Sequence, residues 1–219
     1  MSKKVVQQRA ITDAIKTFAD VENRFNLRRT EDEQFFTEWY EDLPEISDVE
    51  KESLDLIRRR YLYHLTDGNL TEGTVTLLMG SPLLEKAGFY DPPFKMRGEA
   101  SVEIVLDEDD EDAETLRGRI DVLVVQNRFW VALLESKRTT ISVMSALPQT
   151  LAYMMANPNP EQAVFGMVTN GNGIIFVKLS RQGTPQYDVS DTFSPAPLRN
   201  RLYDVLRILK HIGQVVTEG

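Results

Sequence analysis

Three charged residues near the middle of the chain have the types and the spacing of a metal-dependent phosphodiesterase site. Asp121 ends a Gly-Arg-Ile-Asp segment, and Glu135 and Lys137 belong to a Glu-Ser-Lys segment that follows a further apolar run. Phosphodiester cleavage requires a hydroxide near neutral pH and stabilisation of negative charge in the transition state, and a divalent ion provides both. Mg²⁺ prefers oxygen ligands such as one or two carboxylates. The pattern therefore predicts that Asp121 and Glu135 bind metal and that Lys137 assists attack by water.

Two neighbouring strands must position these carboxylates. Residues 120–125 and 129–134 are apolar runs separated by residues 126–128, a pattern typical of a β-hairpin with buried strands. Because opposed residues in an antiparallel pair share a sheet face, a two-residue turn would place Asp121 and Glu135 on opposite faces. A three-residue connection places them on one face. We therefore predict an odd-numbered connection or a bulge at residues 126–128.

A helix after the second strand adds two polar side chains. Gln149 and Tyr153 are four residues apart, so they project from one helical face. Ser142 or Ser145 can cap this helix, and Pro148 is tolerated in its first turn. Polar pairs also occur on helical surfaces by chance, as do charged residues on surface strands. The alternative interpretation is that all these side chains are ordinary solvated groups.

Further acidic residues extend the candidate set. Thr71 can cap a helix with Glu72 in its first turn, where the carboxylate either binds metal or only interacts with the helix dipole. Residues 100–106 alternate as a strand does, and Glu103 is a reserve ligand. The run 107–114 holds seven acids and is expected to form a solvated loop between two strands; a metal site or a DNA mimic is the alternative.

In their order along the chain these motifs resemble the PD-(D/E)XK nuclease superfamily, and in particular the N-terminal nuclease domain of type I restriction enzyme R subunits and short stand-alone bacterial relatives. The resemblance covers about residues 70–179, including the Glu72 helix, the Asp121 strand, Glu-x-Lys, Gln-x-x-x-Tyr and the Val-Thr-Asn-Gly segment at 168–171. It implies an α/β fold, with a restriction-endonuclease-like mixed β-sheet flanked by helices. It also implies a Mg²⁺-dependent endodeoxyribonuclease in which Mn²⁺ can replace Mg²⁺.

The resemblance assigns a role to each candidate residue. Metal binding and catalysis fall to Asp121, Glu135 and Glu72, catalysis to Lys137, and substrate positioning to Gln149 and Tyr153. One departure is Ile120, which stands where the superfamily's name has proline. Another is that no Gly-x-x-x-x-Gly-Lys-[Ser/Thr] segment occurs, so we expect no ATP-driven translocation by this chain itself.

The flanking regions are expected to be mainly helical. We predict a helical N-terminal extension over residues 1–68 and a nuclease-like core with a C-terminal packing helix over residues 69–219. In the extension, residues 5–18 have helical apolar spacing, and capping-box patterns begin at Thr30 and Ser47. The last helix is predicted over residues 197–213, with the apolar stripe Leu198, Leu202, Val205, Leu206, Leu209 and Ile212.

Two further patterns concern a hairpin and the basic residues. Residues 163–169 and 174–179 are predicted strands joined by an Asn-Gly-Asn-Gly turn. The basic residues of the last helix either contact a DNA backbone or are solvated; they are Arg199, Arg201, Arg207 and Lys210. For the Arg-Arg-Arg run at 58–60, solvated charge is the favoured interpretation, because three consecutive residues point in different directions around a helix.

Composition limits the class of protein. The chain has 219 residues, no cysteine and a net charge of −9, of which the seven acids of residues 107–114 account for all but −2. A nucleic-acid partner is therefore compatible with the charge. Without an 18-residue apolar run or a signal-peptide core, we expect a cytoplasmic protein with no membrane partner.

The expected partners are DNA, other subunits of a restriction system and a second copy of the chain. Two other functions stay open. One is a nuclease-fold protein that binds DNA or a partner subunit without cleaving. The other is a structural interaction module that works through the N-terminal helices.

Overall fold

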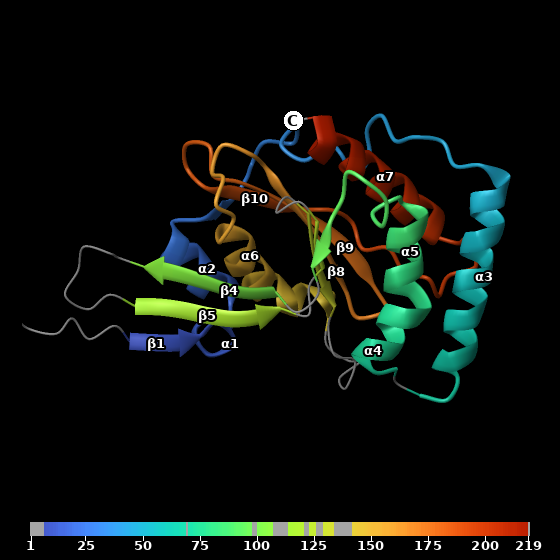
Figure 1. The fold of residues 1–219 in the computed structure, drawn as a ribbon, viewed down its shortest axis with the longest axis horizontal. Coiled ribbons are helices and arrows are strands. Elements are labelled where there is room, and N and C mark those ends of the chain that lie inside the picture. Colours follow the sequence, from blue (N-terminus) through green and yellow to red (C-terminus); the bar gives the residue numbers. More distant parts are fainter. Residues whose placement is uncertain are drawn as a thin grey trace, which may run out of the picture.

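The computed structural model describes residues 7–68, 70–97, 100–106, 114–120, 123–125, 129–133 and 142–218. These residues form two mixed β-sheets flanked by helices (Figure 1), which confirms the predicted α/β class. The larger sheet has the strand order β2-β10-β9-β8-β7-β6-β3, and the smaller has the order β1-β5-β4. The strands are β1 (Gln7–Ala10), β2 (Arg28–Arg29), β3 (Met96–Arg97), β4 (Ala100–Leu106), β5 (Glu114–Ile120), β6 (Leu123–Val125), β7 (Phe129–Leu133), β8 (Val164–Thr169), β9 (Ile174–Ser180) and β10 (Gln186–Val189).

Helices cover the larger sheet on both faces. They are α1 (Ile11–Ala14), α2 (Phe18–Phe25), α3 (Asp48–Leu65), α4 (Glu72–Val75), the π-helical turn η1 (Thr76–Gly80), α5 (Ser81–Lys86), the 3₁₀ turn η3 (Val143–Ala146), α6 (Leu147–Met155) and α7 (Leu202–Glu218). β7 and β8 are parallel, because α6 carries the chain back between them. The predicted mixed sheet with a crossing helix is therefore confirmed, as is the hairpin of β8 and β9.

The central strands are buried on both faces, which explains their unbroken apolar sequences. Along β8, Val164 and Val168 belong to a core on the side of α6, whereas Phe165 and Met167 belong to a core on the opposite side. We call these the α6-side core and the α3-side core. Figure 1 shows α6 and α2 on one side of β8 and β9, and α3, α5 and α7 on the other. The smaller sheet packs on the α6-side core through Leu116.

The N-terminal region is less helical than predicted. Residues 7–10 form β1, which pairs in parallel with β5, so the prediction of one helix over residues 5–18 is wrong there. Sheet pairing with a partner about a hundred residues away overrides the local helical spacing. Thr30 also caps no helix: its hydroxyl accepts the Asp32 N–H within a turn. The capping box at Ser47 is confirmed, and α3 begins directly after it.

The last helix begins five residues later than predicted. Asn200 accepts the Leu202 N–H through its side chain at 3.1 Å, and α7 starts there. Leu198 precedes the helix and is fully exposed, so its place in the apolar stripe was wrong, while the other stripe residues are buried. Among the described residues, no helix is both long and apolar enough to cross a membrane.

Arg58 anchors the segment that leads into α7. Its Nε donates to the Pro195 carbonyl at 2.7 Å, and its Nη2 donates to the Pro197 carbonyl at 2.7 Å. The favoured interpretation of Arg58 as solvated charge is therefore wrong, because three consecutive carbonyls before the helix, from Pro195 to Pro197, accept from its guanidinium.

We expect Arg58→Ala to lower the free energy of unfolding by about 2 kcal/mol, since charged hydrogen bonds to three carbonyls are lost, one of them partly buried. Urea denaturation measures this effect. The matched control is Arg59→Ala, which removes the same charge from an exposed neighbour and should change stability by less than about 0.5 kcal/mol. Equal effects of the two variants would contradict the anchoring role.

Glu50 joins the start of α3 to α7. Its carboxylate accepts from the Ser47 N–H at 2.7 Å and pairs with Lys210 Nζ at 2.6 Å. The hydrogen bond from Lys210, followed by those from Ser47, lowers the pKa of Glu50 to about 2. A carboxyl pKa that is lower in the folded state stabilises the fold above the ordinary value of 4.5, and the stabilisation is lost as the pH falls towards 2.

Glu50→Gln should therefore lower the free energy of unfolding by about 2 kcal/mol at pH 7, with the deficit shrinking as the pH falls below about 4.5. Urea denaturation of both proteins between pH 3 and pH 7 checks this convergence. Glu52→Gln, at an exposed position of the same helix, is the control and should give no pH-dependent difference. A deficit that is constant with pH would contradict the linkage.

Candidate functional site

The register of β6 and β7 is the one that the predicted site requires. Val125 lies opposite Phe129, and Leu123 lies opposite Val131. Three residues, 126–128, therefore separate the paired strand ends, which confirms the predicted odd-numbered connection. The candidate residues Asp121, Glu135 and Lys137 lie outside the described residues, so their shared face stays a prediction.

The carboxyl ends of two parallel strands meet at one edge of the larger sheet. Leu133, the last residue of β7, lies opposite Thr169, the last residue of β8, and Thr169 lies opposite Ile174 at the start of β9. Ligands of α/β sheets commonly bind beyond the carboxyl ends of parallel strands. Glu135 follows Leu133, the last residue of β7, by two residues in the sequence.

A tight turn closes the same edge after β8. The Thr169 hydroxyl donates to the Gly173 carbonyl at 2.8 Å and accepts the Gly171 N–H at 3.0 Å. Asn170 Oδ1 accepts from the N–H groups of Asn172 and Gly173. The turn at 170–173 is thus held by its own side chains, as the Asn-Gly-Asn-Gly sequence suggests.

Tyr61 and α4 pack against this turn from the α3-side core. The Tyr61 hydroxyl donates to Asn172 Oδ1 at 3.3 Å. A Cβ atom at Gly171 would lie 2.5 Å from that hydroxyl and 3.1 Å from Val75 Cγ2. Burial raises the pKa of Tyr61 to about 12, so the phenol remains a neutral donor. The helix that begins at Glu72 therefore lies against the strand edge.

Glu72 has the local setting that was predicted for it. Thr71 caps α4, with its Oγ1 accepting the Thr74 N–H at 3.3 Å, and Glu72 is half-buried in the first turn. The cap is therefore confirmed. Metal binding by Glu72 stays a prediction, and the structure adds that Val75, one helical turn along, contacts the turn at the strand edge.

Gln149 and Tyr153 are on the other side of the sheet from α4. Tyr153 is 7% exposed and belongs to the α6-side core, whereas the Gln149 amide donates to the Ile15 carbonyl at 3.4 Å. These contacts give both residues structural roles, and substrate positioning stays a prediction for them. Pro148 lies in the first turn of α6, as predicted. The predicted cap of this helix by Ser142 or Ser145 is wrong, because α6 begins without a side-chain cap and Ser142 instead caps η3 by accepting the Met144 N–H.

Glu103 is engaged by an arginine of the neighbouring strand. Arg117 lies directly opposite it, and the guanidinium contacts both carboxylate oxygens, at 3.0 and 3.2 Å. The two residues are in the smaller sheet, and opposite charges directly across an antiparallel pair stabilise each other. This cross-strand ion pair gives the Glu103 carboxylate a structural role, and its reserve role as a metal ligand stays a prediction. Within the described ranges, no group of three or more His, Asp or Glu residues is arranged to hold a metal.

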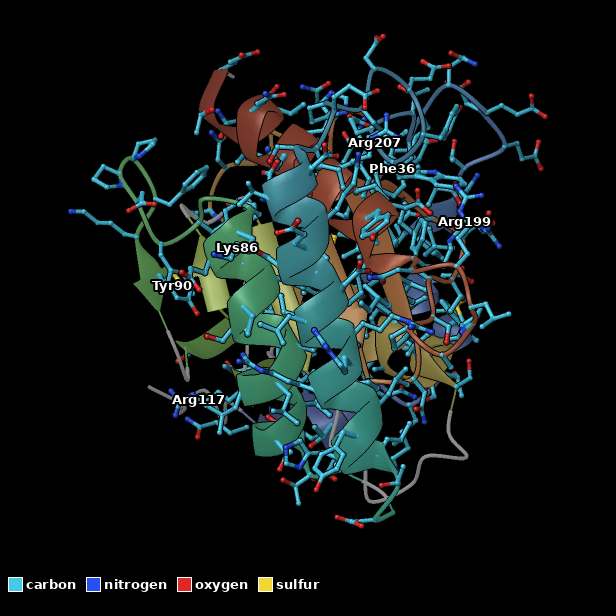
Figure 2. The ribbon with its side chains drawn as sticks, turned by 90° about the vertical axis from the view of Figure 1, so that its right-hand side faces the viewer. Phe36, Lys86, Tyr90, Arg117, Arg199 and Arg207 are labelled. Atoms are coloured by element: carbon cyan, nitrogen blue, oxygen red, sulfur yellow. The ribbon has the colours of Figure 1, made fainter. Side chains whose placement is uncertain are left out.

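Most of the basic residues proposed to contact DNA are used inside the protein. Arg207 donates to the carbonyls of Leu43 and Pro44, Lys210 pairs with Glu50, and Arg201 pairs with Asp204. Arg199 is exposed and lies at the edge of the view in Figure 2, apart from α3 and α5. A DNA-backbone contact by α7 itself is therefore not favoured.

The sequence did not predict that the Tyr61 hydroxyl contacts the turn at the strand edge. Tyr61 is buried on α3, the helix that follows the predicted capping box at Ser47. The available signal was its hydroxyl, because a buried tyrosine usually needs a hydrogen-bond partner. Its partner is 111 residues away in the sequence, so no local pattern identifies it.

Comparison with known proteins gives no relative from which a function can be transferred: the chain matches no protein-family model, no curated protein and no solved structure.

Proposed function

We propose that this protein is a Mg²⁺-dependent endonuclease of the PD-(D/E)XK type that hydrolyses DNA, with other subunits of a restriction system as further partners. The observation that carries the proposal is the register of β6 and β7, because only an odd-numbered connection lets Asp121 and Glu135 share a sheet face. The parallel pair β7 and β8, with α6 between them, supports the restriction-endonuclease-like fold.

The residues of the proposed site fit a hard divalent cation. Asp121, Glu135 and Glu72 offer carboxylate oxygens, which is the donor type that Mg²⁺ prefers, and the chain contains no thiolate that would favour a softer metal. When bound, Mg²⁺ lowers the pKa of a water molecule and stabilises charge on the phosphate. Lys137 orients the attacking water or neutralises a phosphate oxygen. Glu72, which is half-buried on α4, is proposed as the third carboxylate of this site.

The test is cleavage of supercoiled plasmid by the purified chain in Mg²⁺, in Mn²⁺ and in EDTA. We expect nicked and linear products with either metal and none with EDTA. Glu103→Gln is the control, because its carboxylate pairs with Arg117 and should not be needed for cleavage. If DNA is bound but never cut, a nuclease-fold binding protein replaces this proposal. If DNA is neither bound nor cut, the structural-module alternative is favoured.

A further inference from the structure

A small groove opens on the α6 side of the larger sheet. It has a volume of about 130 Å³ and is lined by residues of α2, β2, η3 and β10, namely Phe18, Arg29, Met144, Tyr187 and Val189. Sites for drug-sized ligands measure roughly 300–1,000 Å³. The groove therefore fits one small planar group.

One wall of the groove is aromatic and fixed in place. The rings of Phe18 and Tyr187 are nearly parallel, with an interplanar angle of 7° and centroids 6.2 Å apart. Tyr187 is 3% exposed, and its hydroxyl donates to Glu22 Oε1 at 2.8 Å. Met144 and Val189 add apolar surface beside these rings. Because Tyr187 is almost fully buried, a planar ring that enters the groove stacks on the half-buried ring of Phe18, which Tyr187 holds in place.

The rim of the groove carries a guanidinium with free donors. The Arg29 side chain is 59% exposed, and its Nε donates to Asp188 Oδ1 at 3.1 Å. Within the described part of the chain, no acceptor contacts its two Nη groups. The ion pair with Asp188 holds the guanidinium in position, and the Nη groups can donate to a phosphate. The neighbouring carboxylates Asp188 and Glu22 weaken anion binding, so we expect modest affinity.

The groove is joined to the strand edge of the candidate site by η3. Val143 in η3 is in contact range of the turn, 3.4 Å from the position of a Cβ at Gly173, and the next residue, Met144, lines the groove. A chain that occupied the groove would therefore pass close to the edge where β7 and β8 end.

We propose that this groove binds one unpaired nucleotide of a DNA strand, with its base on the Phe18 ring and its phosphate at Arg29. Base stacking on aromatic side chains together with a basic group is the usual way in which proteins hold single-stranded nucleic acid. A paired base cannot present its face to the wall. The choice of DNA as the ligand rests on the proposed function, and the groove would make the protein prefer unpaired strands.

The experiment measures fluorescence anisotropy of a labelled oligo(dT) in EDTA, where no metal-dependent cleavage occurs. The comparison ligands are an abasic strand with the same number of phosphates and a duplex of the same length. We expect the oligo(dT) to bind about 5- to 10-fold more tightly than the abasic strand, because the base stacks. Equal affinities for these two strands, or tighter binding of the duplex, would overturn the proposal.

Variants locate the binding. Arg29→Gln should weaken oligo(dT) binding about 5-fold, whereas Arg28→Gln, with the same loss of charge from the adjacent exposed residue of β2, should have little effect because it points to the other face. Equal effects of the two arginine variants on oligo(dT) affinity would overturn the assignment of the groove as the binding site. Since no step requires cleavage, a protein that binds but never cuts refutes only the proposed activity.

Discussion

Lys137→Ala should reduce plasmid cleavage at least about 100-fold while Mn²⁺ affinity stays within about 2-fold of wild type. A positioned group that assists proton transfer or charge neutralisation typically contributes about 10²–10⁴-fold to the rate. Lysine is not a ligand of Mg²⁺ or Mn²⁺, so the metal should remain bound. A plasmid-cleavage assay measures the rate, and titration calorimetry with Mn²⁺ on the same preparation measures the metal affinity.

The carboxylate variants should behave differently from the lysine variant. Asp121→Ala and Glu135→Ala should lose both cleavage and Mn²⁺ binding, because each removes a predicted ligand. Lys86→Ala is the control, since this lysine on α5 has only a distant contact with Glu85, 3.9 Å away. If Lys137→Ala cuts like the control, or Asp121→Ala binds Mn²⁺ like wild type, the assignment of the site is wrong.

Glu72→Gln separates two roles of one residue. A metal ligand lost from α4 lowers Mn²⁺ affinity, whereas a carboxylate that interacts only with the helix dipole changes stability by about 0.3–1 kcal/mol and leaves metal affinity unchanged.

Elements specified by local chemistry were predicted well from the sequence. The Ser47 capping box fixes the start of α3, and the Asn-Gly-Asn-Gly turn fixes the hairpin of β8 and β9. The alternation of residues 100–106 gave β4 with its observed bounds. In each case the determining residues lie within a few positions of one another.

Elements that depend on distant partners were not predicted. β1 forms because β5 offers a strand edge to residues 7–10, and the sequence of 7–10 alone resembles a helix. Leu198 has helical spacing, but the side chain of Asn200 starts the helix only after it. Arg58 resembles a solvated charge until the carbonyls of residues 195–197 are brought to it. For the candidate site, the sequence predicted the odd-numbered connection between β6 and β7, whereas the packing of Tyr61 against the turn after β8 required the fold.

Gly171→Ala should be among the most destabilising single substitutions, lowering the free energy of unfolding by about 3 kcal/mol. Two costs combine. Gly171 has φ +87, a left-handed conformation that costs an alanine about 1–2 kcal/mol. The new methyl group would also lie 2.5 Å from the Tyr61 hydroxyl, and forced overpacking typically costs about 1–3 kcal/mol. Urea denaturation measures the sum.

Gly183→Ala separates these two costs. Gly183 has φ +71 but no atom within 4 Å of a Cβ position, so its substitution should cost only the backbone term of about 1–2 kcal/mol. Tyr61→Phe removes the hydroxyl that the methyl group would meet, so Gly171→Ala should cost at least about 0.5 kcal/mol less in that background. Two results together would contradict this contact: Gly171→Ala lowers the free energy of unfolding no more than Gly183→Ala does, and the effects of Gly171→Ala and Tyr61→Phe are additive. The contact between α3 and the turn would then not stabilise the strand edge. If the proposed site lies at that edge, Gly171→Ala should also slow plasmid cleavage at temperatures where the variant is still folded, whereas Gly183→Ala should leave the rate unchanged.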